Sequence, residues 1–506
     1  MTRAVSLQTL IENIEDLDIV GDTNVFVNSV TANSRKITQG SAFIAVKGFT
    51  VDAHEFIGSA ISAGASVIFG ERPFADLPIK IPSNVTYVQL QNARKSIGII
   101  CANFYDRPSQ NMTVIGVTGT DGKTTTCHIL YTILQAHSIA CGMISTLGAY
   151  IGDEKMDTGL HVTSPDPEDV QHALFLMSQK GVTHVVLEVT SHGLDQDRFS
   201  GVTFTISVLT NITHEHLDYH KTFENYRNAK LKLFLLSKTA VLNADDPSFE
   251  YIKNSLPTQK VVSYGIKNSA DWKAVSIETK KKISFVVHSE DVHETILTRL
   301  IGEFNVYNCL AGVAVSVELG LPLQITRSAI QSFLPPKGRL EAIKNSKGLK
   351  IFVDFAHTPN GLEKLLKTLN AELQVEQKLI AVFGSAGERD KTKRFLMGAV
   401  AGKIASLSVV TAEDPRTETV TDISGEIIKG IESVDGKYIQ IDDRGKAIAE
   451  AINTFAKSGD IVVICGKGHE TSMAFGKKEF AWSDQKAVLY ALQNKVLSLE
   501  ELHQAE

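Results

Sequence analysis

Short apolar runs alternate with polar segments along the whole chain, and their spacing predicts an α/β protein. In residues 1–108 the runs "SAFIAV", "ASVIFG" and "VTYVQL" are separated by polar turns, which is typical of a small α/β domain. From "MTVIGVTG" onward, apolar strands each end in a polar loop, and helical stretches lie between them. This pattern predicts mostly parallel sheets that are covered by helices.

A proline pair and a glycine in "SFLPPKGRLE" (332–341) predict a linker, and a second series of strands follows it. These strands end in the polar loops of "IFVDFAHTPN", "IAVFGSAGERDKTKR", "SVVTAEDPRTE" and "IVVICGKGHE". Ligands of open α/β sheets bind at the carboxyl ends of strands, so the last third is predicted to bind a ligand. Because 506 residues are too many for one core, we expect three domains: 1–108, 109–335 and 336–506.

Composition narrows the classes of partner. The net charge is −6 and no long basic run occurs, which argues against nucleic acid. No apolar segment approaches the roughly 20 residues of a membrane helix, and the first residues lack the apolar segment of a signal peptide. The five cysteines form no CxxC pair, which disfavours zinc and disulfides and fits a reducing cytoplasm.

A glycine-rich turn, "GVTGTDGKTTT", stands between an apolar run and the helix-like run "CHILYTIL". The backbone N–H groups of such a turn bind phosphates. Gly119 and Gly122 would let the backbone wrap the phosphates, Lys123 would neutralise their charge, and Thr124 could reach a Mg²⁺ ion. A Walker A loop would need glycine at position 117, which holds valine, so the loop is related to that pattern without matching it. A structural turn with a solvated lysine is the alternative.

Glu188 ends the strongly apolar strand of "THVVLEV", where an unpaired carboxylate would be costly unless it faces solvent or binds a cation. The segment "HEHLDYH" follows the next strand and contributes His214, His216 and His220. Three histidines suggest zinc, but neither a cysteine nor a fourth well-spaced ligand accompanies them. A mixed Glu/His site on a nucleotide-bound Mg²⁺ is therefore predicted.

Lys230 falls on the apolar stripe of a predicted helix in "FENYRNAKLKLFLL". A buried ammonium is costly unless it is paired or chemically altered. A lysine that extends its ammonium to solvent is the alternative. The stripe consists of Phe223, Tyr226, Lys230, Leu233 and Phe234.

Taken together and in order, these motifs resemble those of the Mur ligases. The series comprises "TGTDGKTTT", "EVTSHGL", "HLDYH", "YRNAKLKLF", "GEFNVYN", "VDFAHTPN", "GERDKTKR", "EDPRTE" and "GKGHE". The similarity extends from "NSRKITQGSAFIAVKG" almost to the end of the chain. The family's phosphate loop has the form TGTxGKT, one residue shorter than a Walker A loop, which accounts for the valine at position 117.

The resemblance implies a small N-terminal α/β domain for a UDP-sugar, a central P-loop-like parallel-sheet ATPase domain and a C-terminal Rossmann-like domain for an amino acid. Within the family the motifs are most similar to those of the members that form the UDP-muramoyl tripeptide of peptidoglycan synthesis. Such an enzyme adds a diamino acid to UDP-N-acetylmuramoyl-L-alanyl-D-glutamate. ATP phosphorylates a substrate carboxylate, and the amine of the amino acid attacks the acyl phosphate. A cytoplasmic monomer that uses Mg²⁺ and consumes ATP is expected.

The resemblance also implies roles for single residues. Catalysis would involve Lys123, Glu188, His216 and Lys230. ATP would contact Gly119, Thr120, Gly122, Lys123, Thr124, Thr125, Asn305, Asn308, Arg339, Asp354 and His357. Mg²⁺ would be held by Thr124, Glu188, His216 and Lys230, the last as N6-carboxylysine formed with CO₂. The UDP-muramoyl peptide would contact Ser34, Thr163, Ser164, Ser191 and Arg198. The amino acid would contact Arg389, Glu413, Asp414, Arg416, Gly466 and Glu470.

The chain departs from the family pattern at four places. Asp121 replaces the usual Asn of the phosphate loop, which is tolerable if the carboxylate faces Mg²⁺ or solvent. Asn33 replaces the Asp of the "DSR" element, and Thr190 stands where Ser is common. The fourth departure is "EDPR" (413–416), where "DNPR" is usual for enzymes that use diaminopimelate.

This fourth departure leaves the amino acid open. Arg416 could clamp the distal carboxylate of meso-diaminopimelate, which lysine lacks, and therefore favours diaminopimelate. Asp414 could repel that carboxylate, could pair with Arg416 and cancel the clamp, or could face solvent. L-Lysine thus stays an alternative substrate. Two different functions also stay open, namely a folylpolyglutamate- or cyanophycin-type ligase and a catalytically dead ATP-binding scaffold.

Overall fold

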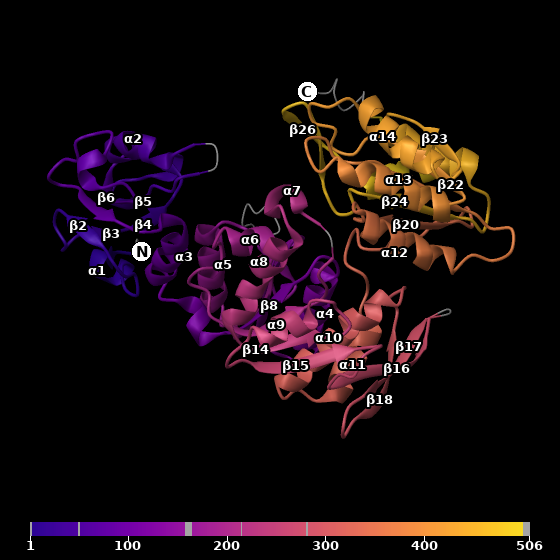
Figure 1. The fold of residues 1–506 in the computed structure, drawn as a ribbon, viewed down its shortest axis with the longest axis horizontal. Helices are drawn as coiled ribbons and strands as arrows, with labels where there is room; N and C mark the ends of the chain where they lie inside the picture. Colours follow the sequence, from indigo (N-terminus) through magenta and orange to yellow (C-terminus); the bar gives the residue numbers. More distant parts are fainter. Residues whose placement is uncertain (1–2, 49–50, 157–163, 214, 280–281, 499–506) are drawn as a thin grey trace.

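The protein contains three large sheets that follow one another along the chain, as the computed structural model shows (Figure 1). The structure describes residues 3–48, 51–156, 164–213, 215–279 and 282–498. Figure 1 shows them as three groups of elements, coloured indigo, purple to pink, and orange to yellow. Each of the three domains proposed from the sequence contains one of these sheets.

The N-terminal sheet has the order β2-β7-β6-β5-β4, in which β4 to β7 are parallel and β2 is antiparallel. The predicted strands are confirmed, because each apolar run forms one of them and its buried side chains fill cores on both faces. The elements are β1 (Val5–Ser6), α1 (Leu7–Leu10), β2 (Asp18–Val20), β3 (Phe26–Val27), β4 (Ser29–Thr31), η1 (Ser34–Lys36), β5 (Ser41–Ile44), α2 (Ile57–Ser62), β6 (Ala65–Gly70), β7 (Thr86–Gln89) and α3 (Ala93–Phe104).

The central sheet has eleven strands in the order β11-β10-β9-β12-β8-β13-β14-β15-β16-β17-β18. Its strands are parallel from β9 to β16 and antiparallel at both edges. The strands are β8 (Thr113–Thr118), β9 (Cys141–Ser145), β10 (Gly148–Ile151), β11 (Glu154–Met156), β12 (His184–Glu188), β13 (Phe204–Leu209), β14 (Ser237–Asn243), β15 (Lys260–Gly265), β16 (Trp272–Glu278), β17 (Ile283–His288) and β18 (His293–Thr298).

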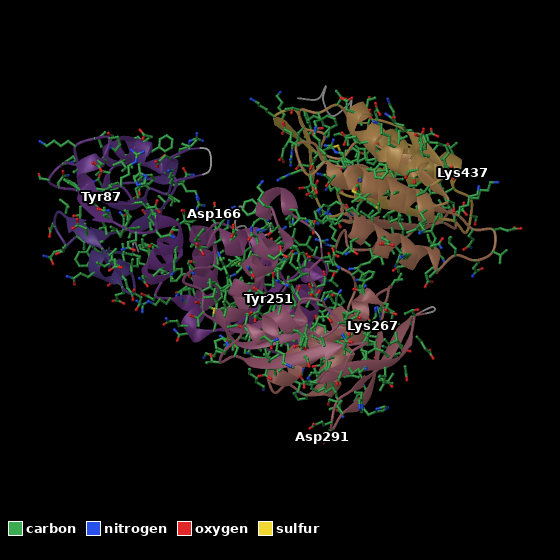
Figure 2. All side chains as sticks on the ribbon, in the orientation of Figure 1. Tyr87, Asp166, Tyr251, Lys267, Asp291 and Lys437 are labelled. Atoms are coloured by element: carbon green, nitrogen blue, oxygen red, sulfur yellow. The ribbon has the colours of Figure 1, made fainter. Side chains whose placement is uncertain are left out.

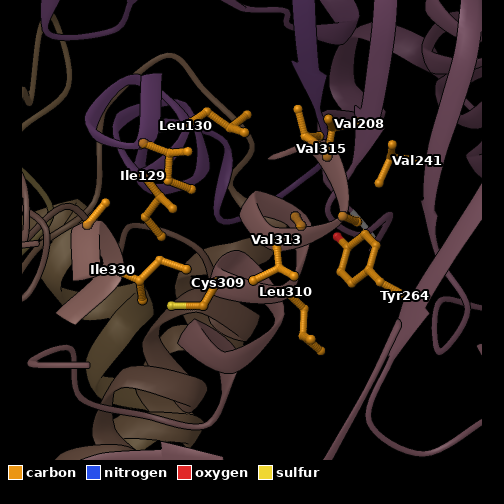
Figure 3. Packing of buried hydrophobic residues seen from close by; sticks show 14 of the residues in the cluster. Ile129, Leu130, Val208, Val241, Tyr264, Cys309, Leu310, Val313, Val315 and Ile330 are labelled. Carbon is orange, nitrogen blue, oxygen red and sulfur yellow. The ribbon is translucent and has the colours of Figure 1, made fainter. Parts of the chain in front are cut away.

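Helices cover this sheet and fix the ends of its strands. Leu130 of α4 and Leu310 of α10 belong to one buried core with Val208 and Val241 of the sheet (Figure 3). The helix α10 is apolar and is buried almost all round. The helices are α4 (Lys123–Ala136), α5 (Pro167–Gln179), α6 (Ser191–Asp195), α7 (Leu217–His220), α8 (Phe223–Leu235), α9 (Phe249–Asn254), α10 (Phe304–Glu318) and α11 (Leu323–Ser332).

The C-terminal sheet has the order β19-β20-β24-β21-β22-β23, parallel except for the edge strand β19. Cores on both of its faces make it a Rossmann-like layer between helices. The elements are β19 (Glu341–Ile343), β20 (Lys350–Asp354), α12 (Pro359–Asn370), β21 (Leu379–Phe383), α13 (Thr392–Ile404), β22 (Leu407–Val410), α14 (Val420–Glu432), β23 (Tyr438–Gln440), α15 (Arg444–Glu450), β24 (Ile461–Cys465), β25 (Ser472–Phe475), β26 (Lys478–Ala481) and α16 (Asp484–Leu492).

The predicted linker joins α11 to β19, because α11 ends at Ser332 and β19 begins at Glu341. The parallel strands on either side of it place the polar loops of each sheet at one edge. In the part of the chain that the structure describes, no helix is long and apolar enough to span a membrane.

Candidate active site

The phosphate loop connects β8 to α4, and its two glycines are required by geometry. Gly119 has φ +155° and Gly122 has φ +81°. A Cβ atom at position 119 would lie 1.8 Å from Oγ1 of Thr210, and one at position 122 would lie 2.6 Å from Oδ1 of Asn308. Only glycine fits this turn, which brings the backbone to the N-terminus of α4, where N–H groups can bind phosphate.

Two lysines share one carbonyl oxygen of this loop. Nζ of Lys123 donates to the Gly119 carbonyl at 3.0 Å and to the Thr120 carbonyl at 2.8 Å. Nζ of Lys230 donates to the same Gly119 carbonyl at 2.8 Å. Lys230 is 1% exposed, so the predicted buried position on α8 is confirmed. Burial, reinforced by the charge of Lys123, lowers the pKa of Lys230 well below its ordinary value and favours the neutral amine.

Thr124 and Glu188 form a pair of oxygen ligands beside the loop. Oγ1 of Thr124 donates to the two carboxylate oxygens of Glu188 at 3.0 and 3.1 Å. The backbone N–H of Thr146 donates to Oε2 of Glu188 at 2.9 Å. Because Glu188 is 2% exposed, the alternative of a solvated carboxylate is excluded. A buried hydroxyl and carboxylate fit a hard cation such as Mg²⁺.

His216 lies at the end of the loop that follows β13, and its backbone is left-handed, with φ 57°. Its ring centroid is 4.8 Å from that of His192. Partial burial and then the charge of His192 lower the pKa of His216, which keeps its imidazole neutral near pH 7. His214 lies outside the described residues. Within the described ranges, no three His, Cys, Asp or Glu side chains are grouped as a metal site, so the fourfold ligand set stays a prediction.

The predicted nucleotide residues come from two domains. On α10, Nδ2 of Asn308 donates to Oδ1 of Asn305 at 2.8 Å. Beyond the linker, Nη2 of Arg339 donates to Oγ1 of Thr124 at 3.1 Å. Two backbone N–H groups, those of Leu340 and Ala356, donate to Asp354 at 2.6 and 2.7 Å, and Nδ1 of His357 lies 2.9 Å from the Phe355 carbonyl. The structure therefore brings together residues more than 200 positions apart.

Two further predicted nucleotide contacts lie in the same loop and helix. Oγ1 of Thr120 shares a hydrogen bond of 2.9 Å with the hydroxyl of Tyr226. Thr125 follows Thr124 in the first turn of α4 and is partly exposed. Tyr226 carries no charge and is buried, so the sequence suggested only a core role for it.

The predicted UDP-substrate residues Ser164, Ser191 and Arg198 lie together in the central domain. Nη1 of Arg198 donates to the Ser164 carbonyl at 2.6 Å and lies 3.5 Å from Asp166, whose position is labelled in Figure 2. Ser191, the first residue of α6, is buried. Thr163 lies outside the described residues. These groups form a cluster of hydroxyls and one guanidinium.

Ser34 comes from the N-terminal domain, in η1. A carboxylate that the sequence analysis missed links this region to the central domain. Oε2 of Glu168 accepts hydrogen bonds from Oγ1 of Thr31 at 2.9 Å and from the N–H of Ala32 at 3.3 Å. Glu168 follows "TSPDP", and nothing in that segment indicates a partner more than 130 residues away.

Asp414 forms a salt bridge with Lys467, a contact that none of the three expectations for it included. Its Oδ1 lies 2.8 Å from Nζ of Lys467 and 2.9 Å from the N–H of Ala474. The main contacts of Asp414 are therefore neither Arg416 nor solvent, and both of those expectations were wrong. Lys467 is 2% exposed and also pairs with Glu470. The charge of Asp414 is thus neutralised inside the protein.

Arg416 keeps its guanidinium available. Its Nη1 donates to the Gly387 carbonyl at 3.1 Å, and among the described residues it forms no ion pair. Arg389 is exposed two residues after that glycine. Both arginines therefore lie beside the same loop, in positions where a carboxylate could reach them.

Glu413 is buried beside Gly466, whose φ is +107°. A Cβ atom at position 466 would lie 2.0 Å from Oε2 of Glu413, so only glycine fits. Oε2 of Glu413 has no hydrogen-bond partner among the described residues. Burial raises the pKa of Glu413 to about 7, although Lys393 and Arg444 oppose this change.

Three family descriptions match successive parts of the chain. "Mur ligase family, catalytic domain" matches residues 26–105, "Mur ligase middle domain" matches 117–316, and "Mur ligase, glutamate ligase domain" matches 338–468. The chain belongs to the Mur ligase family.

Two relatives and one solved structure that match this Mur ligase over nearly its whole length have the same name. The UDP-N-acetylmuramoyl-L-alanyl-D-glutamate–2,6-diaminopimelate ligase of Alkaliphilus metalliredigens is 37% identical over 95% of this chain and 96% of its own. The ligase of the same name from Clostridioides difficile is 37% identical over 95% and 98%. A solved structure of a ligase with that name has a TM-score of 0.69, 29% identity and coverage of 98% of this chain and 99% of its own.

Two further carboxylates of this Mur ligase, those of Asp121 and Glu215, were not among the predicted site residues. Asp121 was expected to face Mg²⁺ or solvent; its side chain is 30% exposed, and its carboxylate also lies 3.2 Å from Nζ of Lys364 on α12. Glu215 was missed, although it stands between two histidines of "HEH". Burial and the charge of Asp121 raise the pKa of Glu215 to about 7. Glu215 lies 3.7 Å from Nε2 of His357 and thus faces the C-terminal domain.

The raised pKa of Glu413 predicts how stability depends on pH. Its pKa is about 7 in the folded state and near 4.5 in the unfolded state, so the contribution of Glu413 to stability falls as pH rises from about 4.5 to 7. We expect Glu413→Gln to raise the melting temperature relative to wild type more at pH 8 than at pH 5. The difference corresponds to an unfolding free energy on the order of 1–3 kcal/mol. Equal shifts at both pH values, measured by calorimetry, would contradict the assignment.

Proposed function

We propose that this Mur ligase adds meso-diaminopimelate to UDP-N-acetylmuramoyl-L-alanyl-D-glutamate at the expense of ATP. The observation that carries the choice of amino acid is the pairing of Asp414 with Lys467, which leaves Arg416 without an acidic partner among the described residues. A free guanidinium can bind the distal carboxylate through two parallel hydrogen bonds. The names of the full-length relatives support the same amino acid.

The side chains around the phosphate loop would perform distinct tasks. Lys123 would neutralise the phosphates of ATP, and Thr124, Glu188 and His216 would hold Mg²⁺ together with a carbamylated Lys230. Magnesium would supply charge neutralisation on the transferred phosphoryl group. Asn305, Asn308, Arg339, Asp354 and His357 would position the nucleotide between the central and C-terminal domains, close to the N-terminus of α4.

The acyl-phosphate route assigns the remaining groups. Ser34, Ser164, Ser191 and Arg198 would hold the UDP-muramoyl dipeptide at the junction of the first two domains. A carboxylate of its glutamate would attack the γ-phosphorus of ATP with ADP as the leaving group. The amine of the amino acid would then attack the acyl carbon, lose a proton and displace phosphate. Positioning of the reacting groups supplies much of the rate. We place this reaction in the cytoplasm, where the five free, buried cysteines stay reduced, and expect a monomer.

The test is a phosphate-release assay with purified protein. We expect release only when ATP, the UDP-muramoyl dipeptide and the amino acid are present together. The value of kcat/KM for meso-diaminopimelate should exceed that for L-lysine by about 100-fold, roughly 2.7 kcal/mol. Arg416→Ala should remove most of this preference, and Arg416→Lys should restore it only in part, because lysine cannot form the bidentate contact.

Asp414→Asn is the matched control for the neighbouring position. Because Lys467 already neutralises Asp414 and retains Glu470 as a partner, this variant should keep the preference for meso-diaminopimelate. A preference for L-lysine in the wild type that survives in Asp414→Asn would refute the assignment of both residues. Phosphate release without the UDP-muramoyl dipeptide would refute the proposed reaction.

A further inference from the structure

The phosphate loop contacts the C-terminal domain through Asp121. The backbone of Asp121 is held by the end of β13. Its carbonyl accepts hydrogen bonds from Oγ1 of Thr210 at 2.6 Å and Nδ2 of Asn211 at 3.1 Å, and its N–H donates to Oδ1 of Asn211 at 3.0 Å. The carboxylate therefore projects from a fixed point.

Two residues of α12 meet that carboxylate. Nδ2 of Asn360 donates to Oδ2 of Asp121 at 3.0 Å, and Nζ of Lys364 donates to the same oxygen at 3.2 Å. Because they are four positions apart, both donors lie on one face of the helix. Asn360 also donates to Oγ1 of Thr213, in the loop after β13, at 3.3 Å. The contact thus joins one helix of the C-terminal domain to two loops of the central domain.

The opposite face of α12 is fixed to its own domain. Its leucines are fully or almost fully buried in the C-terminal core, so the helix cannot shift without moving the sheet beneath it. Figure 1 shows α12 on the side of the C-terminal domain that faces the central domain. The buried leucines are Leu362, Leu365, Leu366 and Leu369.

Charge explains why an acid is tolerated in a loop that would bind phosphates. A carboxylate there would repel a phosphate, but the ammonium of Lys364 neutralises it from the other domain. An asparagine at position 121 could share a hydrogen bond with Asn360 but could not attract the ammonium. The acid at position 121 therefore gives this chain an electrostatic contact between the two domains.

We propose that Asp121, Asn360 and Lys364 form a polar latch that positions the C-terminal domain, and with it the amino-acid site, against the phosphate loop. The three are positioning residues, which act through the domain that they hold. The contacts of these three residues do not depend on which amino acid the enzyme uses. A measurement of the distance between the central and C-terminal domains therefore tests the latch in either case.

The test measures the distance between the domains in the full-length protein without nucleotide. All five native cysteines are buried, so spin labels can be placed selectively at cysteines introduced in place of Asn254 and Val375, which are exposed. We expect one dominant distance in the otherwise wild-type protein. Lys364→Met should reduce that population about two- to fivefold, the range for a partly exposed ion pair.

Lys367→Met is the matched control, because Lys367 lies on the same helix but pairs with Glu363 and is mostly exposed. It should leave the distances unchanged. Asp121→Asn should broaden them, and adding Asn360→Asp should restore the dominant distance, since the amide–carboxylate pair is then rebuilt with exchanged partners. Identical distributions for Lys364→Met and Lys367→Met, or an exchange variant as broad as Asp121→Asn, would overturn the latch.

A kinetic measurement separates the latch from general damage to the fold. Lys364→Met should raise the KM for the amino acid about two- to fivefold and change the Kd of ATP by less than about twofold. The latch would be overturned if Lys364→Met raised the Kd of ATP as much as the KM for the amino acid. It would also be overturned if this variant lowered the melting temperature as much as a core substitution does, because the contact would then have only a structural role.

Discussion

Replacing Lys123 with alanine should abolish turnover while UDP-substrate binding stays nearly intact. Its ammonium lies over the phosphate loop, 3.0 and 2.8 Å from the carbonyls of Gly119 and Thr120. Lys230 also reaches the Gly119 carbonyl, but burial opposes its charge, so it cannot replace the lost cation. We expect a fall in kcat of at least about 100-fold, roughly 2.7 kcal/mol of transition-state stabilisation.

Two measurements test this expectation. Single-turnover phosphate release gives the chemical step, and calorimetric titration gives the affinity for the UDP-muramoyl dipeptide, whose proposed contacts with Ser164 and Arg198 lie in other loops. Lys437→Ala is the control, since Lys437 lies on the outer surface of the C-terminal domain (Figure 2). A Lys123→Ala enzyme that kept more than about a tenth of the wild-type rate would exclude the phosphate role.

Lys230→Ala should be inactive but partly rescued by short carboxylic acids. Burial and Lys123 favour the neutral amine of Lys230, and only that form attacks CO₂, giving a carbamate and one proton. The carbamate would present two oxygens at the phosphate loop, where the amine of Lys230 now contacts the Gly119 carbonyl. Acetate or formate could fill the space left by the deleted side chain and restore part of the lost oxygen ligands. We expect a loss of at least about 100-fold and a rescue of about tenfold.

The direct readout is the carbamate carbon in an NMR spectrum recorded with ¹³C-labelled bicarbonate. Wild-type protein should show the signal, and Lys230→Ala should lack it. Lys232→Ala is the matched control on the same helix, because the Lys232 side chain is 43% exposed, and it should retain both the signal and the activity. Rescue by methylamine instead of acetate would show that Lys230 works as an ammonium and would refute carbamylation.

Local patterns were enough to place the strands and the phosphate loop. The apolar runs before each polar loop became the strands of three sheets, because a run of four to seven apolar residues must be buried on both faces. The helical repeat also placed Lys230 on the apolar stripe of its helix, but only its burial in the structure excluded an ammonium that reaches solvent. Side-chain spacing along one element is a property of sequence alone.

Contacts between distant elements could not be predicted in this way. The sequence left three possibilities for Asp414, and the salt bridge to Lys467 arises only because β22 and β24 end at the same edge of the sheet. Glu215 was missed because its significance comes from burial next to Asp121 and opposite His357. Neither the salt bridge of Asp414 nor the surroundings of Glu215 can be predicted from the residues next to them in the sequence.

The family, the three-part order of the chain and the residue types of the phosphate loop could all be inferred from the amino-acid sequence, because glycines with positive φ, apolar repeats and an ordered motif series depend on short stretches. Which charges meet depends instead on how the chain folds. Asp121 faces Lys364, 243 positions away, and Thr124 meets Arg339, 215 positions away. Coulomb interactions act through space and depend on burial, so the partner of a charged group is fixed by how domains pack and not by its neighbours along the chain.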